Sequence, residues 1–199
     1  MKQRAVEDVS ALPTSGFGSA SPIWWGTLAF MALEGTGFAL AGGTYLYLLQ
    51  VNGQWPLGAP PPNHWPGTLM LLLLLASLWP NALTDGAARE QKLRPVQLWL
   101  ILMSVIGVIA VAIRAWEFSQ LNVRWDDNAY GSITWFILGL HATHLLTDLG
   151  DTVVLAVRMF TRHVNTKRFS DVSDNAFYWY FVVGSWVPLY ALLYGVPRL

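Results

Sequence analysis

The chain contains 199 residues, of which 54% are hydrophobic and 12% are charged, and its formal net charge is zero. Because about 25% of the residues of an average soluble domain are charged, this composition argues against a soluble monomer. The zero net charge argues against nucleic-acid binding, which requires a basic patch. The chain has no cysteine, which excludes disulfides, cysteine-bound zinc, iron–sulfur clusters and covalently attached c-type haem from this chain.

The first predicted element is a polar segment, residues 1–21, which mixes small side chains with charges of both signs. A secretory signal has an apolar core directly after a positively charged start, and this segment has no such core. We therefore predict an aqueous, cytoplasmic tail over residues 1–21 and a membrane domain over residues 22–197.

Five apolar stretches follow the tail. A helix needs about 20 largely apolar residues to cross a hydrocarbon core that is about 30 Å thick. Five stretches meet this requirement or nearly so, at about residues 24–49, 65–83, 96–116, 130–157 and 177–193. They cannot all be buried within one domain of this size. The sequence therefore predicts an all-α integral membrane bundle of five transmembrane helices.

The basic residues indicate the orientation of this bundle. They lie in the tail and in the second and fourth loops: Lys2, Arg4, Arg89, Lys92, Arg94, Arg158, Arg162, Lys167 and Arg168. The first loop has no basic residue, and the third has only Arg124, beside two aspartates. Since cytoplasmic loops are enriched in Lys and Arg, we expect a cytoplasmic N-terminus and an outside C-terminus.

Glu34 lies well inside the first predicted helix. A charged carboxylate at that depth costs about 2.5–3.5 kcal/mol or more and is usually functional, and burial disfavours its charged form. Two interpretations remain: a group that handles protons, or a neutral acid that joins two helices by hydrogen bonds.

Small residues recur on the same helix at a spacing of four, at Gly35, Ala39 and Gly43. Such a stripe allows another helix to approach closely. We therefore expect this face to pack against a second helix, either of this chain or of a partner.

His141 and His144 lie three residues apart and share one face of the fourth predicted helix. Two axial haem ligands normally come from two helices, and a copper site needs about three converging ligands. We therefore expect no metal in this chain and two histidines that hydrogen-bond to neighbouring helices.

We expect other ionisable residues to join the two histidines in a polar network. Asp148 and Asp151 continue the face of His144 and could form a polar ladder with Arg158. Glu117 ends the third predicted helix beside Arg114, where it is either solvated or part of the network. The sequence contains no phosphate-binding loop, nucleophile elbow or HExxH motif, and so indicates no catalytic centre.

Four fragments, the second of them in two parts, resemble subunit III of the haem-copper oxidases, which include cytochrome c oxidase and its quinol-oxidase relatives. Residues 26–34 resemble the family helix that bears a buried, carbodiimide-reactive glutamate. Residues 114–118 and 127–132 resemble Q-A-x-E-[YF] and D-x-x-Y-G-S, and residues 139–144 resemble G-x-H-G-x-H. Residues 178–182, with Trp186 and Tyr190, resemble Y-W-H-F-V-D-x-x-W.

The chain departs from these patterns at four positions. Arg114 replaces the family's Gln, Ala142 replaces its Gly, and Tyr180 and Val183 replace its last His and Asp. The resemblance begins at what would be the third helix of a seven-helix member. It therefore implies a short, five-helix bacterial form in which the tail takes the place of the first two helices.

This resemblance implies a non-catalytic subunit of an oxygen-reducing, proton-translocating oxidase of aerobic electron transport, in a bacterial inner membrane. Subunit I would be its direct partner and would hold the haem and copper, with subunit II and other respiratory subunits in the same complex and no cofactor in this chain. The resemblance also implies contact with membrane lipids and allows bound phospholipid. Glu34 would be the reactive carboxylate, and Glu117, His141 and His144 would be structural members of the polar network.

Two rival assignments remain open. One is a subunit-III-like accessory protein of a nitric-oxide reductase, which the loss of the terminal His and Asp favours. The other is a stand-alone b-type cytochrome or small transporter that uses the histidines and Glu34. The large subunit that purifies with the chain distinguishes the first, and a haem spectrum or transport activity of the isolated chain distinguishes the second.

Overall fold

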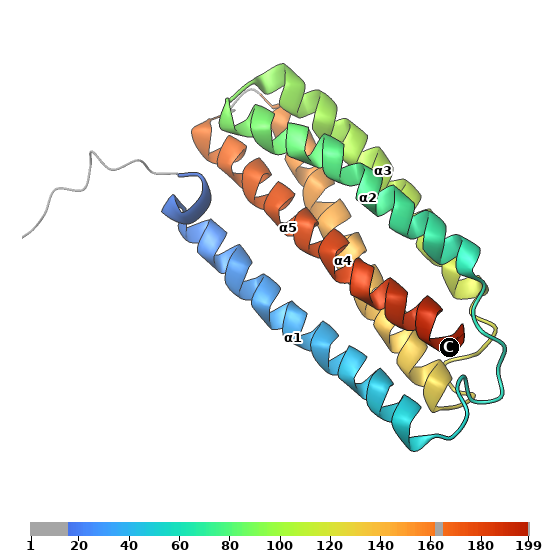
Figure 1. The fold of residues 1–199 in the computed structure, drawn as a ribbon. Coiled ribbons are helices and arrows are strands. Elements are labelled where there is room, and N and C mark those ends of the chain that lie inside the picture. The colour runs from blue at the N-terminus through green and yellow to red at the C-terminus, as the bar shows by residue number, and fades with distance from the viewer. Residues whose placement is uncertain (1–15, 162–164, 199) are drawn as a thin grey trace, which may run out of the picture.

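The computed structural model describes residues 16–161 and 165–198, and within them the chain forms five long helices and no strand (Figure 1). Residues 1–15 of the predicted tail lie outside this part. The helices are α1 (Pro22–Val51), α2 (His64–Arg89), α3 (Leu93–Ser119), α4 (Ala129–Met159) and α5 (Thr166–Tyr190). The predicted all-α bundle of five helices is confirmed.

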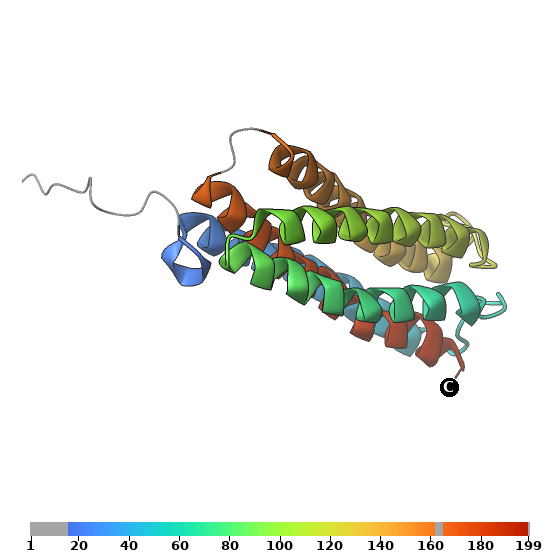
Figure 2. The same ribbon diagram turned by 90° about the horizontal axis from the view of Figure 1, so that it is seen from above.

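Four of the helices form a closed ring, and the fifth lies outside it. The packed pairs are α2 with α3, α3 with α4, α4 with α5, and α5 with α2. Helix α1 packs mainly on α4 and α5 and runs along the flank away from α2 and α3 (Figures 1 and 2). The main core lies inside the ring, around Leu74, Leu138, Trp179 and Trp186. Helix α1 therefore leaves room for a cleft where it crosses α4 and α5.

Short polar side chains begin four of the five helices. Ser21 accepts a hydrogen bond from the backbone of α1, and Asn63, Asn128 and Asn165 do the same for α2, α4 and α5. These caps satisfy backbone N–H groups that have no partner within the first turn of a helix. The helix starts are thus determined locally, by residues at the ends of the apolar stretches.

The corner before α4 explains one of the sequence motifs. The backbone N–H of Arg124 donates to Asp127 at 2.7 Å, and the hydroxyl of Ser132 donates to the carbonyl of Trp125 at 2.7 Å. Gly131 lies against the carbonyl of Arg124, and a side chain at this position would collide with it. The D-N-A-Y-G-S segment therefore requires its glycine for a close approach of two backbones.

The fifth helix begins eleven residues before the predicted start at residue 177, because α5 starts at Thr166. The additional turns are polar in sequence, so a hydropathy criterion does not detect them. They nevertheless bury Phe169, Val172 and Ala176 on one face, two of which join a small apolar cluster with α2, α3 and α4. After α5 the chain continues as a π-helical turn, Ala191–Gly195, and a 3₁₀ turn, Val196–Arg198.

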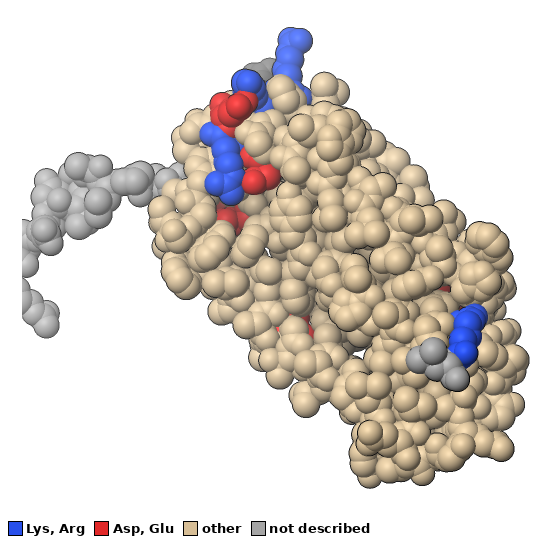
Figure 3. Space-filling view, viewed as in Figure 1, with Lys and Arg blue, Asp and Glu red and all other residues tan. Residues whose placement is uncertain are grey.

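The distribution of polar residues fits a membrane bundle. By length and composition alone, three helical segments can cross a membrane: His64–Arg89, Leu93–Ser119 and Thr166–Arg198. Helices α1 and α4 are long enough but are diluted by glycine and threonine in α1 and by histidine and aspartate in α4. On the face drawn in Figure 3, charged side chains gather at one end of the bundle, a single basic group lies at the other, and the flank between them is almost uncharged.

Candidate functional site: a polar cleft beside the first helix

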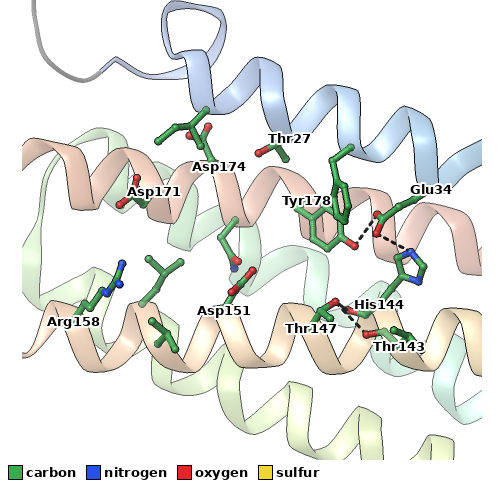
Figure 4. Close-up of a pocket in the computed structure, with 15 residues that line it drawn as sticks. Thr27, Glu34, Thr143, His144, Thr147, Asp151, Arg158, Asp171, Asp174 and Tyr178 are labelled. Carbon is green, nitrogen blue, oxygen red and sulfur yellow. Dashed lines mark hydrogen bonds and ion pairs between the residues drawn. The ribbon is translucent and has the colours of Figure 1, made fainter.

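A cleft of about 540 Å³ separates α1 from α4 and α5. Apolar side chains from the three helices form much of its wall, including Phe30 and Leu155. Glu34 and His144 also line it, and four further charged residues do so: Asp151, Arg158, Asp171 and Asp174 (Figure 4). The cleft therefore brings together ionisable groups from three helices that are far apart in the sequence.

Glu34 contacts two side chains across the cleft. The hydroxyl of Tyr178 in α5 donates to its Oε2 at 2.8 Å. The Nε2 atom of His144 in α4 lies 3.0 Å from its Oε1, which is ion-pair distance, although the contact does not meet hydrogen-bond geometry. The side chains of Glu34 and His144 are 14% and 6% exposed. Figure 4 shows the three side chains pointing toward one another from α1, α4 and α5.

The surroundings of His144 limit where protons can lie. Its Nδ1 is 2.5 Å from the carbonyl oxygen of Leu140, and a carbonyl can only accept, so Nδ1 carries a proton. In a neutral ring Nε2 is then an acceptor, whereas in a charged ring Nε2–H would face the carboxylate of Glu34. The pair thus places an acid and a base 3.0 Å apart across the cleft.

The end of the cleft nearest the loops is more strongly charged. Arg158 and Asp151 are exposed, while Asp174 is 4% exposed and neither of its carboxylate oxygens has a hydrogen-bond partner among the described residues. Asp171 lies between these extremes. Charged side chains, two of them exposed, thus line the cleft at one end, and the Glu34–His144 pair lies farther in (Figure 4).

A second polar cluster lies inside the ring, toward the other end of the bundle. Arg114 in α3 donates to Glu117 at 2.5 Å and approaches Nδ1 of His141 at 2.9 Å. The hydroxyl of Tyr194, in the π-helical turn, donates to the second oxygen of Glu117. Arg114 and Glu117 are 3% and 1% exposed, and the guanidinium stacks 3.9 Å from the ring of Trp186. Glu117 is therefore buried in an ion pair.

The partners of His141 determine its tautomer. A guanidinium has no acceptor, so Nδ1 of His141 accepts from Arg114. Nε2 must then carry the hydrogen, which it donates to the carbonyl oxygen of Val182 at 3.0 Å. Both ring nitrogens are engaged, and His141 is fully buried. The side chains of His141 and His144 belong to different clusters, and the ring of Phe38 lies near both.

Asp148 does not extend along the cleft with Asp151. Its side chain is 3% exposed and turns toward α2 and α5, where it lines a separate small void. Asp151 lines the cleft, together with Arg158. The polar ladder suggested by the spacing on α4 is therefore divided between two environments.

The predicted small-residue stripe faces α5 in part. Gly35, Ala39 and Gly43 line a shallow apolar groove of about 560 Å³ that α1 forms with α5. A side chain at Gly35 would lie 3.6 Å from Phe181, whereas at Gly43 it would meet no atom within 4 Å. Within this chain the stripe is thus in contact at one end and open at the other.

Within residues 16–161 and 165–198, no group of three metal-binding side chains converges. The sequence alone did not indicate Tyr178, Tyr194 or Asp174 as site residues. Tyr178 opens the Y-W-x-F-V segment, so the motif contained a signal for it. Asp174 lay outside the predicted fifth helix, and Tyr194 reaches Glu117 only because of a π-helical turn that no periodicity indicates.

Comparison with known proteins agrees with the resemblance. The sequence profile of the family described as cytochrome c oxidase subunit III matches residues 73–196. A protein of Thermostichus vulcanus named cytochrome c oxidase subunit 3 is 24% identical over 176 residues, which cover 87% of each chain. A protein of Mycobacterium tuberculosis H37Rv named probable cytochrome c oxidase subunit 3 is 25% identical over 153 residues, or 74% of each chain.

A relative from an animal has the same name. The cytochrome c oxidase subunit 3 of Struthio camelus is 27% identical over 151 residues, which are 73% of this chain and 56% of that protein. The profile match covers more than half of the chain and includes α3, α4 and α5, with all the residues of the second polar cluster. The chain belongs to the cytochrome c oxidase subunit III family.

Proposed function

We propose that this chain is the non-catalytic subunit III of a cytochrome c oxidase in aerobic electron transport. The observation that carries the proposal is the profile match over residues 73–196. Relatives with this name also align with the chain over most of their length. A nitric-oxide reductase accessory protein is not favoured, because the matched relatives are named as oxidase subunits. The chain would contribute to the complex without performing the oxygen chemistry itself.

Glu34 and His144 would support proton uptake by the catalytic subunit. The cleft offers exposed charged groups, Asp151 and Arg158, and an inner Glu34–His144 pair at 3.0 Å separation. Tyr178 keeps the carboxyl of Glu34 oriented toward His144. A proton could thus be taken from water at the mouth of the cleft and held at Glu34, within the membrane domain.

The haem and copper would belong to subunit I, which would contact this chain directly, with subunit II in the same complex. His141 uses both ring nitrogens in hydrogen bonds, and His144 uses Nδ1 for the carbonyl of Leu140. Ligation of a metal by His141 would break one of those bonds and remove a partner from the buried Arg114. The residues of this chain therefore fit a structural role better than a ligand role.

The chain would cross a bacterial cell membrane several times, with its N-terminus in the cytoplasm. Six basic residues of the described chain belong to the end where α2 meets α3 and α4 meets α5: Arg89, Lys92, Arg94, Arg158, Lys167 and Arg168. The opposite end has Arg124 and Arg198, and Arg124 is paired with Asp126 at 3.0 Å. Since basic residues mark the cytoplasmic side, this asymmetry supports the orientation.

Affinity purification tests the proposal. A tag on this chain, in mild detergent, should recover a haem-copper large subunit in equal amount, the absorbance of its haems, and oxygen reduction with cytochrome c. Deleting the gene should remove this chain from the complex, and re-expression should restore it. Recovery of a nitric-oxide reductase, or of haem bound to this chain alone, would contradict the proposal.

A further inference from the structure

A void of about 10 Å³ lies inside the ring, between α2, α3, α4 and α5. Its polar lining comes from Asn81 and Thr84 of α2, Asp148 and Thr152 of α4, and Asn175 of α5. A cavity needs an accessible volume of roughly 10–15 Å³ to hold one water molecule, and a buried water needs two to four polar partners. The void thus has the size and the polarity for one water.

Asp148 lacks the partners that a buried carboxyl requires. Its Oδ1 has no hydrogen-bond partner among the described residues, and Oδ2 is 3.5 Å from the hydroxyl of Thr152, at the limit of a hydrogen bond. No described Lys or Arg forms an ion pair with it. Asp151, one helical turn away, adds a negative charge rather than a positive one. An ionised carboxylate in this position would be strongly destabilising.

A neutral carboxylic acid at Asp148 and one water molecule would satisfy the carboxyl oxygen that lacks a partner. The acid O–H can donate to the water, and the water can donate to a neighbouring oxygen. The hydroxyl of Thr84 already donates to the carbonyl of Pro80 at 2.9 Å, so its lone pairs are available as acceptors. Buried polar groups without protein partners are normally satisfied by such internal waters.

We propose that the void inside the ring of α2, α3, α4 and α5 is a binding site for a single water molecule, which is held by Asp148 as a neutral carboxylic acid. The site is separate from the Glu34–His144 pair, because Asp148 does not line the cleft. Asn175 lines both spaces and donates to Thr152 at 2.9 Å. The water is thus enclosed behind Asn175 and Thr152, apart from the Glu34–His144 pair.

Infrared spectroscopy of the complex that contains this chain tests the protonation of Asp148. Aspartate labelled with ¹³C at its carboxyl carbon distinguishes this band from that of Glu34. We expect Asp148→Asn to remove one labelled acid C=O band. Asp151→Asn, a matched change one turn along α4, should leave that band in place. If Asp148→Asn removes no labelled acid band, Asp148 is not a neutral acid and the proposal is wrong.

A structure of the same complex, at a resolution that reveals buried waters elsewhere, tests the water directly. One ordered water within hydrogen-bond distance of Asp148 supports the proposal. An empty void, in a map that resolves other internal waters, overturns it. Neither result depends on the identity of the large subunit, so a failure here is distinct from a failure of the proposed function.

Discussion

His144 and Glu34 connect α4 to α1 through a contact of 3.0 Å between Nε2 and Oε1. Helix α1 lies outside the ring formed by the other four helices, so this contact joins the ring to its neighbour at the middle of the bundle. Tyr178 adds a bond from α5 to the same carboxyl, at 2.8 Å. The carboxyl of Glu34 therefore links α1 to both α4 and α5.

Glu34 should be the carboxyl that reacts with a hydrophobic carbodiimide. The reagent modifies carboxyl groups that are reached from an apolar phase, and Glu34 lies near the apolar side chain of Phe30 in the wall of the cleft, with 14% of its side chain exposed. We expect labelling of the wild-type chain and its loss in Glu34→Gln, measured by mass spectrometry. Asp151→Asn, which changes another carboxyl of the cleft, should be labelled like the wild type. Undiminished labelling of Glu34→Gln would refute the assignment.

Tyr178→Phe should destabilise the bundle by about 0.5–1.5 kcal/mol, the usual contribution of one hydrogen bond. The substitution removes the hydroxyl that donates to Glu34 and retains the ring. The free energy of unfolding in detergent is the measurement. Tyr47→Phe is the control, because Tyr47 is 63% exposed and should be neutral. In the double variant with Glu34→Gln, strictly additive effects would show that the two residues do not interact.

Arg114→Gln should cost about 3–5 kcal/mol, because it leaves the buried carboxylate of Glu117 without its cation. The double variant Arg114→Gln with Glu117→Gln should regain a large part of that loss, since no unpaired charge then remains. Unfolding midpoints of the three variants give the comparison. Arg124→Gln, in an exposed ion pair with Asp126, should have no measurable effect. An equal loss in the single and double variants would contradict a buried ion pair.

Gly67→Ala should separate Tyr194 from Glu117. A side chain at residue 67 would run into the ring of Tyr194, whose hydroxyl donates to Glu117. We expect a loss of stability of about 1–3 kcal/mol, which is typical of overpacking. Gly86 lies in the same helix, and a Cβ atom added there would meet no atom within 4 Å. Gly86→Ala should therefore be neutral or stabilising, by up to about 1 kcal/mol. Equal behaviour of the two alanine variants would show that Gly67 tolerates a side chain.

The orientation can be tested with single cysteines, because the chain contains none. A membrane-impermeant maleimide added to intact cells should label Ala129→Cys, at the exposed start of α4. It should not label Lys92→Cys, between α2 and α3, until the membrane is opened. Lys92 is well exposed, with 61% of its side chain accessible, so protection would reflect its location. The reverse pattern would place the N-terminus outside.

The sequence alone determined the fold class and the number of helices. Hydropathy over segments of about 20 residues is a local property, and so are the Ser and Asn caps that begin the helices. The starts of the first four helices therefore lie within about three residues of the predicted positions, as do the ends of α1, α3 and α4, but α2 continues to Arg89, beyond the predicted end at residue 83. The fifth helix was predicted to start too late, because its first turns are polar and are stabilised by burial of Phe169 and Val172 against other helices.

Sequence spacing also selected Glu34, Glu117, His141, His144 and Asp148, since an ionisable group within an apolar stretch is visible without a structure. Only the tertiary structure decided which of them meet. His141 and His144 share a face of α4 but join different clusters, because Arg114 approaches from α3 and Glu34 from α1. Helical periodicity fixes the side of one helix on which a residue lies. The partner of that residue depends on how separate helices pack, and this is a long-range property that no local pattern contains.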